Sequence, residues 1–217
     1  MNPLYFTVWC FYRAAFCLYF RWRVYNPARV PSQGPVILAA NHASFLDPPL
    51  VGAALNRPIH YLARENLFSV PLLGWALHRV NVVPVDRDGG GAKGLRAILD
   101  RLLAGAAIIL FPEGTRTRDG QLQPVRAGIG LTVLKSNCPV VPVRVFGTRE
   151  AYGRQMRFPL PRPVGVKFGV PLDFAKLREE AETCSKARLK AIYQQIADEL
   201  MAAISKLEPY EDKETFP

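Results

Sequence analysis

The chain has 217 residues, enough for one domain with a sizeable hydrophobic core. Hydrophobic residues make up 49% and charged residues 21%, as in globular proteins, and only the polar tail 209–217 is predicted to fray. Lys and Arg total 28 against 18 Asp and Glu, and the net charge of +10 favours an anionic partner, either nucleic acid or anionic lipid. A soluble protein that simply has a high pI is the alternative.

The first 20 residues are almost uncharged and rich in aromatic side chains. They contain a single charge, Arg13, and the basic residues Arg21 and Arg23 follow directly. A membrane-spanning helix needs about 20 apolar residues, whereas aromatic density beside basic residues is typical of the membrane interface. We therefore expect residues 1–25 to form an N-terminal membrane-anchoring segment. A helix packed on the domain and a full membrane span are the alternatives.

The flanks of this segment, and the cysteines, predict the compartment. No basic region precedes the segment and no small-residue cleavage site follows it, which disfavours a secretory signal. If the segment spans the membrane, the basic residues on its C-terminal side place the rest of the chain on the cytoplasmic face. Four cysteines, at positions 10, 17, 138 and 184, show no C-x-x-C spacing, and the chain has only three histidines. We therefore expect no metal site and no disulfide framework.

The first predicted strand, 35–40, leads into the sequence NHASFLD. Its residues PVILAA form a compact apolar run, as in a buried strand, and LDPPLVGAAL follows with the pattern of a helix. We expect Ser44 to cap this helix, because Pro48 and Pro49 are tolerated only in a first turn. His42 would then emerge at the carboxyl end of a strand, where open α/β sheets place their chemistry.

His42 and Asp47 are the first candidate catalytic residues. If the loop curls back into the helix, the Asp47 carboxylate can accept the imidazole N–H, which leaves the other ring nitrogen free as a base. Histidine titrates near pH ~6.5, so it can take a hydroxyl proton at neutral pH. The alternative is a loop histidine that caps backbone groups, with Asp47 serving the N-terminus of the helix.

Two further strands are predicted at 59–63 and 79–85. The second ends before Arg87, which would add a cation at the same edge of the sheet, although a surface arginine is the simpler explanation. A glycine run at 89–91 then precedes an amphipathic helix over 92–104. This run lacks the Ser or Thr and the spacing of a P-loop, which disfavours a nucleotide-binding protein.

A fully apolar strand at 106–111 is followed by the sequence PEGTRTRDG. Glu113 would lie at the same edge as the first motif if the strands are parallel. Gly114 allows close backbone approach to a ligand, and the planar guanidinium of Arg116 can hold phosphate through two hydrogen bonds. Arg126 adds positive charge nearby. A solvated turn with a surface Glu–Arg ion pair is the alternative.

The remaining elements continue the alternation of strands and helices. We expect a helix at 128–136, strands at 138–146 and 164–170, and a long C-terminal helix with apolar residues at spacings of three and four. This pattern predicts an α/β fold with a largely parallel sheet flanked by helices, together with the N-terminal membrane-associating helix. A base beside a group of arginines at one edge is typical of an enzyme that acts on the hydroxyl of a phosphate ester.

These motifs resemble those of a known family. NHASFLD is similar to the N-H-x-S-x-x-D block of the glycerolipid acyltransferases, the group of 1-acylglycerol-3-phosphate acyltransferases, and FPEGTRT (111–117) is similar to their F-P-E-G-T-R block. The segment from Gly74 to Arg87 resembles the second block of the family and VVPV (140–143) the fourth. Order and spacing also agree, so the resemblance covers residues 30–170.

The resemblance implies an enzyme that moves a fatty acyl group to the sn-2 hydroxyl of lysophosphatidic acid, making phosphatidic acid for phospholipid synthesis. The donor would be acyl-CoA or acyl-carrier protein, a co-substrate, so no cofactor or metal is implied. His42 would act as the base and Asp47 would orient it, within an acyltransferase domain over residues 26–208. The implied substrate-binding residues are Arg87, Glu113, Gly114, Thr115, Arg116 and Arg126. An anionic membrane surface is expected as a partner, and nucleic acid is not.

Two departures from the family pattern concern the acceptor. Residues 83–85 are Val-Pro-Val where the family often has Phe and a polar residue, and Arg126 stands where it commonly has Lys. Arg keeps the charge but not the geometry, which leaves the acceptor headgroup open. A lipid hydrolase is one rival function, although no serine lies in a G-x-S-x-G motif. A non-catalytic lipid- or phosphate-binding module is another, but it has no use for a His–Asp pair.

Overall fold

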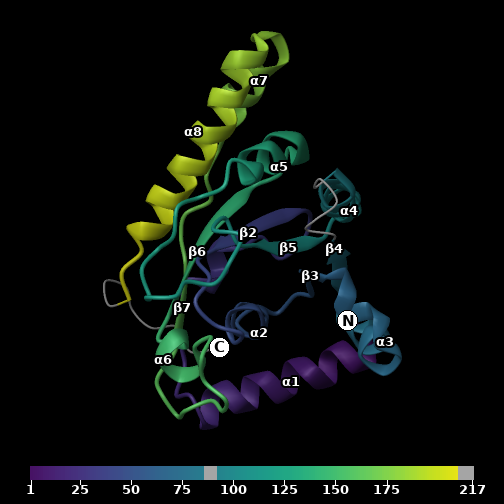
Figure 1. Cartoon of the computed structure of the whole chain (residues 1–217), viewed down its shortest axis with the longest axis vertical. Helices are drawn as coiled ribbons and strands as arrows, with labels where there is room; N and C mark the ends of the chain where they lie inside the picture. The colour runs from purple at the N-terminus through teal and green to yellow at the C-terminus, as the bar shows by residue number, and fades with distance from the viewer. Residues whose placement is uncertain (86–91, 210–217) are drawn as a thin grey trace.

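The computed structural model describes residues 1–85 and 92–209, in which a seven-stranded sheet has helices on both faces (Figure 1). The strands are β1 (Arg23–Tyr25), β2 (Val36–Ala40), β3 (Ile59–Arg64), β4 (Val82–Val85), β5 (Ala107–Leu110), β6 (Val140–Phe146) and β7 (Gly165–Phe168). Their order across the sheet is β1-β7-β6-β2-β5-β3-β4. Only β6 and β7 pair in antiparallel fashion among the described strands, so the predicted α/β fold with a largely parallel sheet is confirmed.

The helices divide between the two faces of the sheet. They are α1 (Pro3–Leu18), α2 (Asp47–Ala53), α3 (Pro71–Arg79), α4 (Ala92–Leu103), α5 (Gly128–Ser136), α6 (Thr148–Tyr152), α7 (Ala175–Thr183) and α8 (Lys186–Ser205), with short 3-10 helices η1 (Pro27–Arg29) and η2 (Glu65–Ser69). Helices α1 and α2 contribute to the core on one face, and α4, α5 and α8 form the core on the other (Figure 1).

Strand β2 shows why its sequence is apolar at every position. Val36, Leu38 and Ala40 point into the core with α1 and α2, and Ile37 and Ala39 point into the core with α4, α5 and α8. Side chains alternate between the two faces of a strand, and both faces of this sheet are covered by helices. All five side chains are therefore fully buried.

Several elements differ from the sequence prediction. The sequence did not predict strand β1, helices α3, α6 and α7 or the two 3-10 helices. Most of these elements are short, and their formation depends on packing against the rest of the chain. The strand predicted at 164–170 forms as β7 but runs antiparallel to β6. The short helix α6 and the loop after it connect β6 to β7, and the chain returns along β6 in the opposite direction. The polar tail 210–217 lies outside the described residues.

Helix α2 begins at Asp47, so the prediction that Ser44 caps the helix is wrong. The buried Ser44 hydroxyl instead donates a hydrogen bond to the backbone oxygen of Tyr152, at 2.6 Å. The physical reason lies in the first turn. Pro48 and Pro49 have no backbone N–H, so this helix presents no donor at the positions where a capping side chain normally binds.

Helix α1 packs on α2 through one face and exposes apolar side chains on the other. Phe16 is fully buried, and the Arg13 guanidinium donates to the backbone oxygen of the last residue of α2, at 3.0 Å. Phe11 and Leu18 are 66% and 83% exposed. None of the described helices is long and apolar enough to cross a membrane. Residues 23–25, which the sequence assigned to the anchor, instead form strand β1, because they pair with β7.

Candidate active site

Three loops leave the sheet at the same edge. Strands β2, β5 and β3 are parallel neighbours, so the segments that follow their carboxyl ends start close together. These segments carry His42, Glu113 and the residues after Arg64. The two sequence motifs are also joined directly, because the Thr117 N–H donates to the backbone oxygen of His42 at 2.8 Å. The expectation that both motifs share one edge of the sheet is confirmed.

His42 and Asp47 form a hydrogen-bonded pair. His42 Nδ1 lies 2.8 Å from Asp47 Oδ2, and the same oxygen accepts the backbone N–H groups of Ala43 and Ser44 at 2.6 and 2.7 Å. An ionised carboxylate only accepts hydrogen bonds, so Nδ1 carries the hydrogen and Nε2 is left as the basic nitrogen. The Asp47 side chain is fully buried, whereas that of His42 is 15% exposed. The pair therefore has the arrangement of a base held by a carboxylate.

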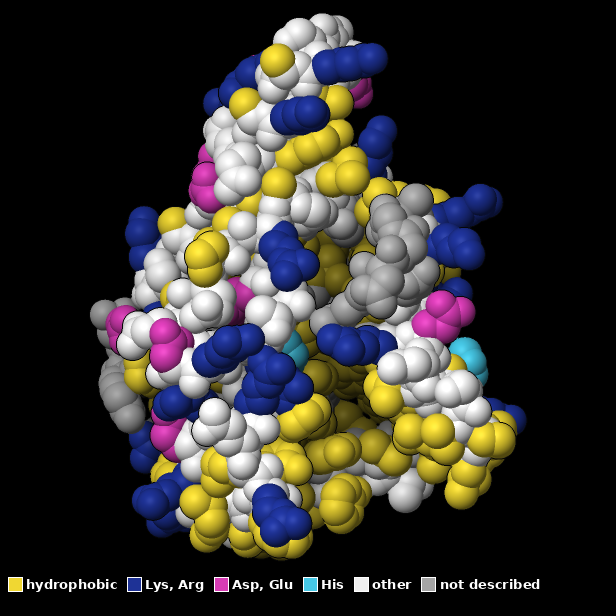
Figure 2. Space-filling model, viewed as in Figure 1, with side chains coloured by type: hydrophobic (Ala, Val, Ile, Leu, Met, Phe, Trp, Pro, Cys, Tyr) yellow, Lys and Arg dark blue, Asp and Glu magenta, His cyan; other side chains and the backbone are white. Residues whose placement is uncertain are grey.

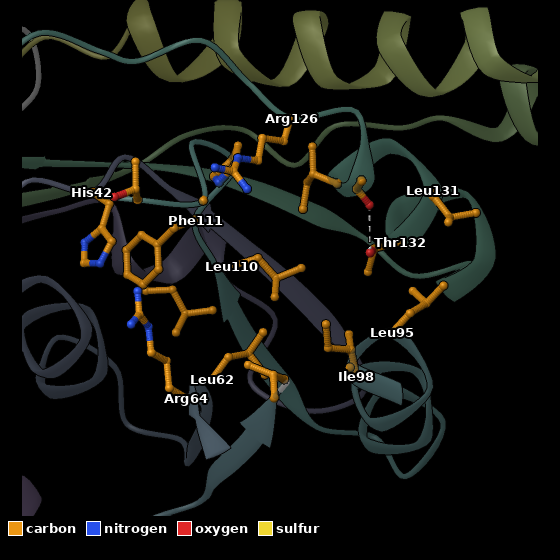
Figure 3. A pocket seen from close by; sticks show the side chains of 18 of the residues that line it. His42, Leu62, Arg64, Leu95, Ile98, Leu110, Phe111, Arg126, Leu131 and Thr132 are labelled. Atoms are coloured by element: carbon orange, nitrogen blue, oxygen red, sulfur yellow. Dashed lines mark hydrogen bonds between the residues drawn. The ribbon is translucent and has the colours of Figure 1, made fainter. Parts of the chain in front are cut away.

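Phe111 fixes the plane of the His42 imidazole ring. Its ring stacks on the His42 ring, with centroids 3.9 Å apart and planes inclined by 17°. The hydrogen bond to Asp47 sets the direction of the ring, and the stacking sets its plane. His42 and Phe111 both line a large cavity, side by side at one end of it (Figure 3).

Glu113 ties the two motifs together. Its Oε1 accepts the backbone N–H of His42 at 2.7 Å, and its Oε2 accepts the backbone N–H of Gln123 at 2.8 Å. The residue is buried, and burial raises the pKa of its carboxyl, opposed in part by the N–H groups of Gln123 and His42. The sequence grouped Glu113 with the substrate-binding residues, but both its oxygens bind backbone amides. This geometry gives it a part in positioning the His42 loop.

Gly114 and Arg126 are in close contact. Gly114 has φ +69, in the left-handed region, and a Cβ there would lie 2.8 Å from Arg126 Nε. Glycine therefore meets both the backbone conformation and the close approach of the guanidinium. Both residues line the large cavity, as does Thr115. The structure thus brings three of the predicted substrate-binding residues to one wall.

Arg116 lies on the ring of Phe45. Its guanidinium carbon is 3.5 Å from the ring centroid, and Phe45 is 55% exposed. Stacking of this kind sets the orientation of the planar guanidinium. Phe45 was not singled out in the sequence, because it occupies a variable position of the first motif. The sequence feature that could have identified Phe45 is an aromatic residue close to the candidate base, His42, in the same loop.

The large cavity has a polar end and an apolar end. Its volume is about 1150 Å³. In Figure 3 the side chains of His42, Arg64 and Arg126 gather at one end, and the space continues between β5, α4 and α5. Apolar side chains line that part, namely Leu62, Leu95, Ile98, Leu110, Ile129 and Leu131. The site can therefore hold an anionic group near the base and a hydrocarbon chain beyond it.

For two arginines, the structure and the sequence prediction do not correspond. Arg87 lies outside the described residues, so its predicted place at the site stays a prediction. Arg64, which the sequence did not single out, ends β3 and lines the polar end of the cavity. The strand was predicted to stop at residue 63, and the first charged residue after an apolar strand was the available signal. Figure 2 shows Lys and Arg side chains on both sides of a hollow lined by hydrophobic side chains.

In the ranges 1–85 and 92–209, no set of three or more His, Cys, Asp or Glu side chains is placed to hold a metal ion. All four cysteines are free thiols. The polar groups of the site are instead a base, a carboxylate and guanidinium groups, which suit proton transfer and anion binding.

Comparison with known proteins shows which family this chain resembles. A family model described as Acyltransferase matches residues 21–146. A chloroplastic 1-acyl-sn-glycerol-3-phosphate acyltransferase of Brassica napus is 33% identical over 119 residues, which cover 54% of this chain and 34% of that protein. A 1-acyl-sn-glycerol-3-phosphate acyltransferase of Bacillus subtilis is 29% identical over 126 residues, covering 58% of this chain and 62% of the relative. The matched region thus spans about a third of the plant relative's length.

Two further similarities concern a different acceptor and the fold. A lyso-ornithine lipid O-acyltransferase of Pseudomonas aeruginosa is 29% identical over 145 residues, covering 66% of this chain and 54% of that protein. The crystal structure of the 1-acyl-sn-glycerophosphate acyltransferase of Thermotoga maritima superposes with a TM-score of 0.71 at 23% identity, over 94% of this chain and 81% of the other. The sheet and its flanking helices therefore follow a known fold.

Proposed function

The chain belongs to the acyltransferase family, and on that premise we propose that it acylates the sn-2 hydroxyl of lysophosphatidic acid to form phosphatidic acid. The observation that carries the proposal is the His42–Asp47 pair at the polar end of a cavity whose other end is apolar. The acyl donor is a thioester, either acyl-CoA or acyl-carrier protein, and the reaction needs no further cofactor.

His42 Nε2 is the base of the proposed reaction. It takes the proton of the sn-2 hydroxyl as the oxygen attacks the thioester carbonyl, and the buried Asp47 carboxylate stabilises the imidazolium that forms. The tetrahedral intermediate then collapses, the carbon–sulfur bond breaks, and the leaving thiolate receives the proton from Nε2. The ester forms without a covalent enzyme intermediate, so the base returns to its starting state.

Arginines hold the acceptor phosphate in this proposal. Arg64 and Arg126 line the polar end of the cavity, and Arg116 lies nearby on Phe45. A guanidinium binds phosphate through paired hydrogen bonds, and several around one anion compensate its charge. Gly114 supports this arrangement because it leaves room for the Arg126 side chain. The apolar part of the cavity between α4 and α5 takes the acyl chain of the donor.

The active site would lie against a membrane, on its cytoplasmic face. The ends of α1 contact two segments that also expose apolar side chains: Asn2 Nδ2 donates to the backbone of Arg79 at the end of α3, and the Tyr19 hydroxyl donates to Pro159. The exposed apolar side chains of these segments include Phe6, Phe11, Leu18, Leu72, Trp75 and Phe158. Together with the net charge of +10, they support docking on an anionic bilayer.

A lipid hydrolase fits the geometry less well. The serine nearest to the base in the sequence is Ser44, which is buried and donates its hydroxyl hydrogen to the backbone of Tyr152. Its oxygen also accepts the backbone N–H of Leu46 at 3.0 Å. A hydroxyl held in this way supports the loop and is not available as a nucleophile.

An assay matrix tests the function. Purified protein is given lysophosphatidic acid, lysophosphatidylcholine or lyso-ornithine lipid as acceptor, with acyl-CoA or acyl-carrier protein as donor. We expect phosphatidic acid from lysophosphatidic acid, and His42→Ala should lower the rate by about 10²–10⁴-fold. His78→Ala, which changes an exposed histidine on α3, is the matched control. Faster turnover of lyso-ornithine lipid, or hydrolysis without a donor, would contradict the proposal.

A further inference from the structure

A second cavity lies on the other side of β3 from the first, between α1, α2 and the end of α3. Its volume is about 290 Å³, close to the lower end of the range for ligand pockets, ~300 Å³. Its walls are apolar or aromatic, with Val8 and Tyr12 from α1, Ala53 from α2 and Ala63 from β3. In Figure 2 the hollow between α1 and α3 is lined by hydrophobic side chains. The catalytic machinery described above does not use this space.

Two tyrosine hydroxyls at this cavity, those of Tyr5 and Tyr61, have partners within the protein. The Tyr5 hydroxyl accepts the backbone N–H of Ile59 at 3.0 Å and lies 3.4 Å from the Tyr61 hydroxyl. Burial raises the pKa of Tyr12, and burial together with the neighbouring Tyr5 raises the pKa of Tyr61 well above its usual value. The cavity is thus an environment of low polarity, which suits a hydrocarbon group.

The second cavity adjoins the active site. Leu62 lines both cavities, and Phe45 lines the second one while its ring carries the Arg116 guanidinium. Pro48, in the first turn of α2, also lines it, one residue after Asp47. A ligand there would therefore have its polar end beside Arg116 and the His42–Asp47 pair. This combination matches an amphiphile with an anionic headgroup and one hydrocarbon chain.

We propose that this second cavity holds the sn-1 acyl chain of the lysolipid acceptor. The inference rests on the proposed function, in which the acceptor and the donor each bring one chain to His42. The first cavity would take the donor chain and the second the acceptor chain. The two chains then approach the base from opposite sides of Leu62, and the sn-2 hydroxyl lies between them.

Two observations assign the second cavity to the acceptor. Its walls come from α1 and α3, which also expose Phe6 and Trp75, so a lipid that leaves a bilayer beneath these helices meets this cavity first. Arg116 at its margin suits the phosphate that lysophosphatidic acid carries one carbon from its reacting hydroxyl. A thioester donor has its phosphates or protein carrier far from the reacting carbon, and the larger cavity has room for it.

The kinetic test narrows the second cavity from the side of α1. Val8→Trp places an indole in it, and Thr7→Trp is the matched control, because Thr7 has the shape of valine but is exposed one position away. Each protein is assayed with lysophosphatidic acids of increasing sn-1 chain length, kept below their micelle-forming concentrations, at a fixed donor. Donor chains of increasing length are then compared at a fixed short acceptor.

For the wild type and Thr7→Trp, kcat/KM should rise about fourfold for each added sn-1 methylene until the cavity is filled. For Val8→Trp the rise should stop several methylenes earlier, while the donor series is unchanged. A shift in donor preference instead would assign the second cavity to the donor. Identical acceptor series in all three proteins would show that the cavity binds neither chain. Either result overturns the proposal.

A labelling experiment tests which cavity holds the sn-1 chain, and it requires neither catalytic turnover nor a variant. A lysophosphatidic acid with a diazirine at the end of its sn-1 chain is photolysed with wild-type protein on vesicles, and labelled peptides are identified by mass spectrometry. We expect label on α1, α2 or β3, at residues such as Val8, Ala53 or Ala63. Label on α4 or α5, at Leu95 or Leu131, would overturn the proposal. Failure of the proposed function appears separately, as no phosphatidic acid formed by the wild type with any donor.

Discussion

Asp47 holds His42 and the loop around it with a single oxygen. Oδ2 accepts the imidazole hydrogen and the N–H groups of Ala43 and Ser44. The sequence predicted the first of these hydrogen bonds from the five-residue spacing. It did not predict the other two, because they depend on the backbone path between the two residues. They hold the carboxylate in place and thereby fix the position of the imidazole.

Asp47→Asn should therefore lower kcat by about 10²–10⁴-fold, because the neutral amide does not stabilise the imidazolium or fix its tautomer. Thermal unfolding should still be cooperative, since the amide oxygen can accept the same N–H groups. Asp100→Asn, an exposed carboxylate on α4, is the control for the loss of one negative charge. A rate within threefold of the wild type would contradict the role of Asp47.

Glu113 is expected to act through His42. Glu113→Gln places an amide N–H against a backbone N–H of either His42 or Gln123, which displaces the loop that carries the base. A misplaced catalytic group can cost up to about 100-fold in rate, so kcat should fall while the acceptor KM changes little. A rise in acceptor KM at unchanged kcat would instead mean that Glu113 binds the acceptor. Steady-state kinetics at saturating donor separates the two.

Glu113 should also affect the pH dependence of stability. Its pKa is raised above the usual 4.5, with burial as the main cause. The native state therefore holds this proton more tightly than the unfolded chain, so the stabilising contribution is complete below pH 4.5 and is lost as pH rises through the raised value. Wild type should lose unfolding free energy relative to Glu113→Gln across that window. Equal pH slopes in denaturant titrations would refute this.

Gly114→Ala tests the close approach of Arg126. The left-handed backbone, with φ +69, costs a non-glycine residue about 1–2 kcal/mol of stability, and the added methyl also displaces the guanidinium. Gly105→Ala is the matched control, because φ is +81 there and nothing lies within 4 Å of its Cβ position. Both variants should lose similar stability, but only Gly114→Ala should raise the acceptor KM. If Gly114→Ala and Gly105→Ala had equal acceptor KM values, Arg126 would have no part in acceptor binding.

At the scale of single elements, the two motif-bearing loops show what local sequence predicts well. Strands β2 and β5 were predicted within one residue at each end, because runs of apolar residues buried on both faces have one plausible structure in an α/β protein. The N-cap of α2 was predicted at Ser44, two residues before the N-cap that the structure has, Leu46. Helix α2 has no side-chain cap, because two consecutive prolines remove the N–H donors of its first turn and Asp47 binds the preceding loop.

The proposed docking on an anionic bilayer can be tested by changing helix α1 alone. Phe11→Ser combined with Leu18→Ser removes apolar area from its exposed face and leaves the buried Phe16 in place. Each buried apolar side chain contributes about 1.5–3 kcal/mol, so partitioning onto anionic vesicles should fall at least about tenfold without a change in melting temperature. Leu103→Ser, an exposed leucine on α4, should leave vesicle binding unchanged. Binding retained by the double variant would show that the basic surface suffices.

At the scale of the whole molecule, the sheet order decides which distant residues meet. Strands β2, β5 and β3 are adjacent although α4 and β4 lie between β3 and β5 in the chain. Three loops therefore converge on one edge, and the helices that cover the sheet leave an apolar cavity on each side of β3. In the proposed function, the two hydrocarbon chains would be joined to one glycerol unit where these two cavities approach each other.

The sequence by itself determined the class of fold, the His42–Asp47 pair and the presence of an arginine-rich second motif. These follow from residues close together in the chain, where spacing and strand or helix periodicity set the geometry. Only the tertiary structure decided that Glu113 binds backbone amides, that Arg64 joins the site, and that Phe45 carries Arg116. Those contacts join segments up to about 70 residues apart, as between His42 and Glu113, and depend on strand order and packing, which local patterns do not encode.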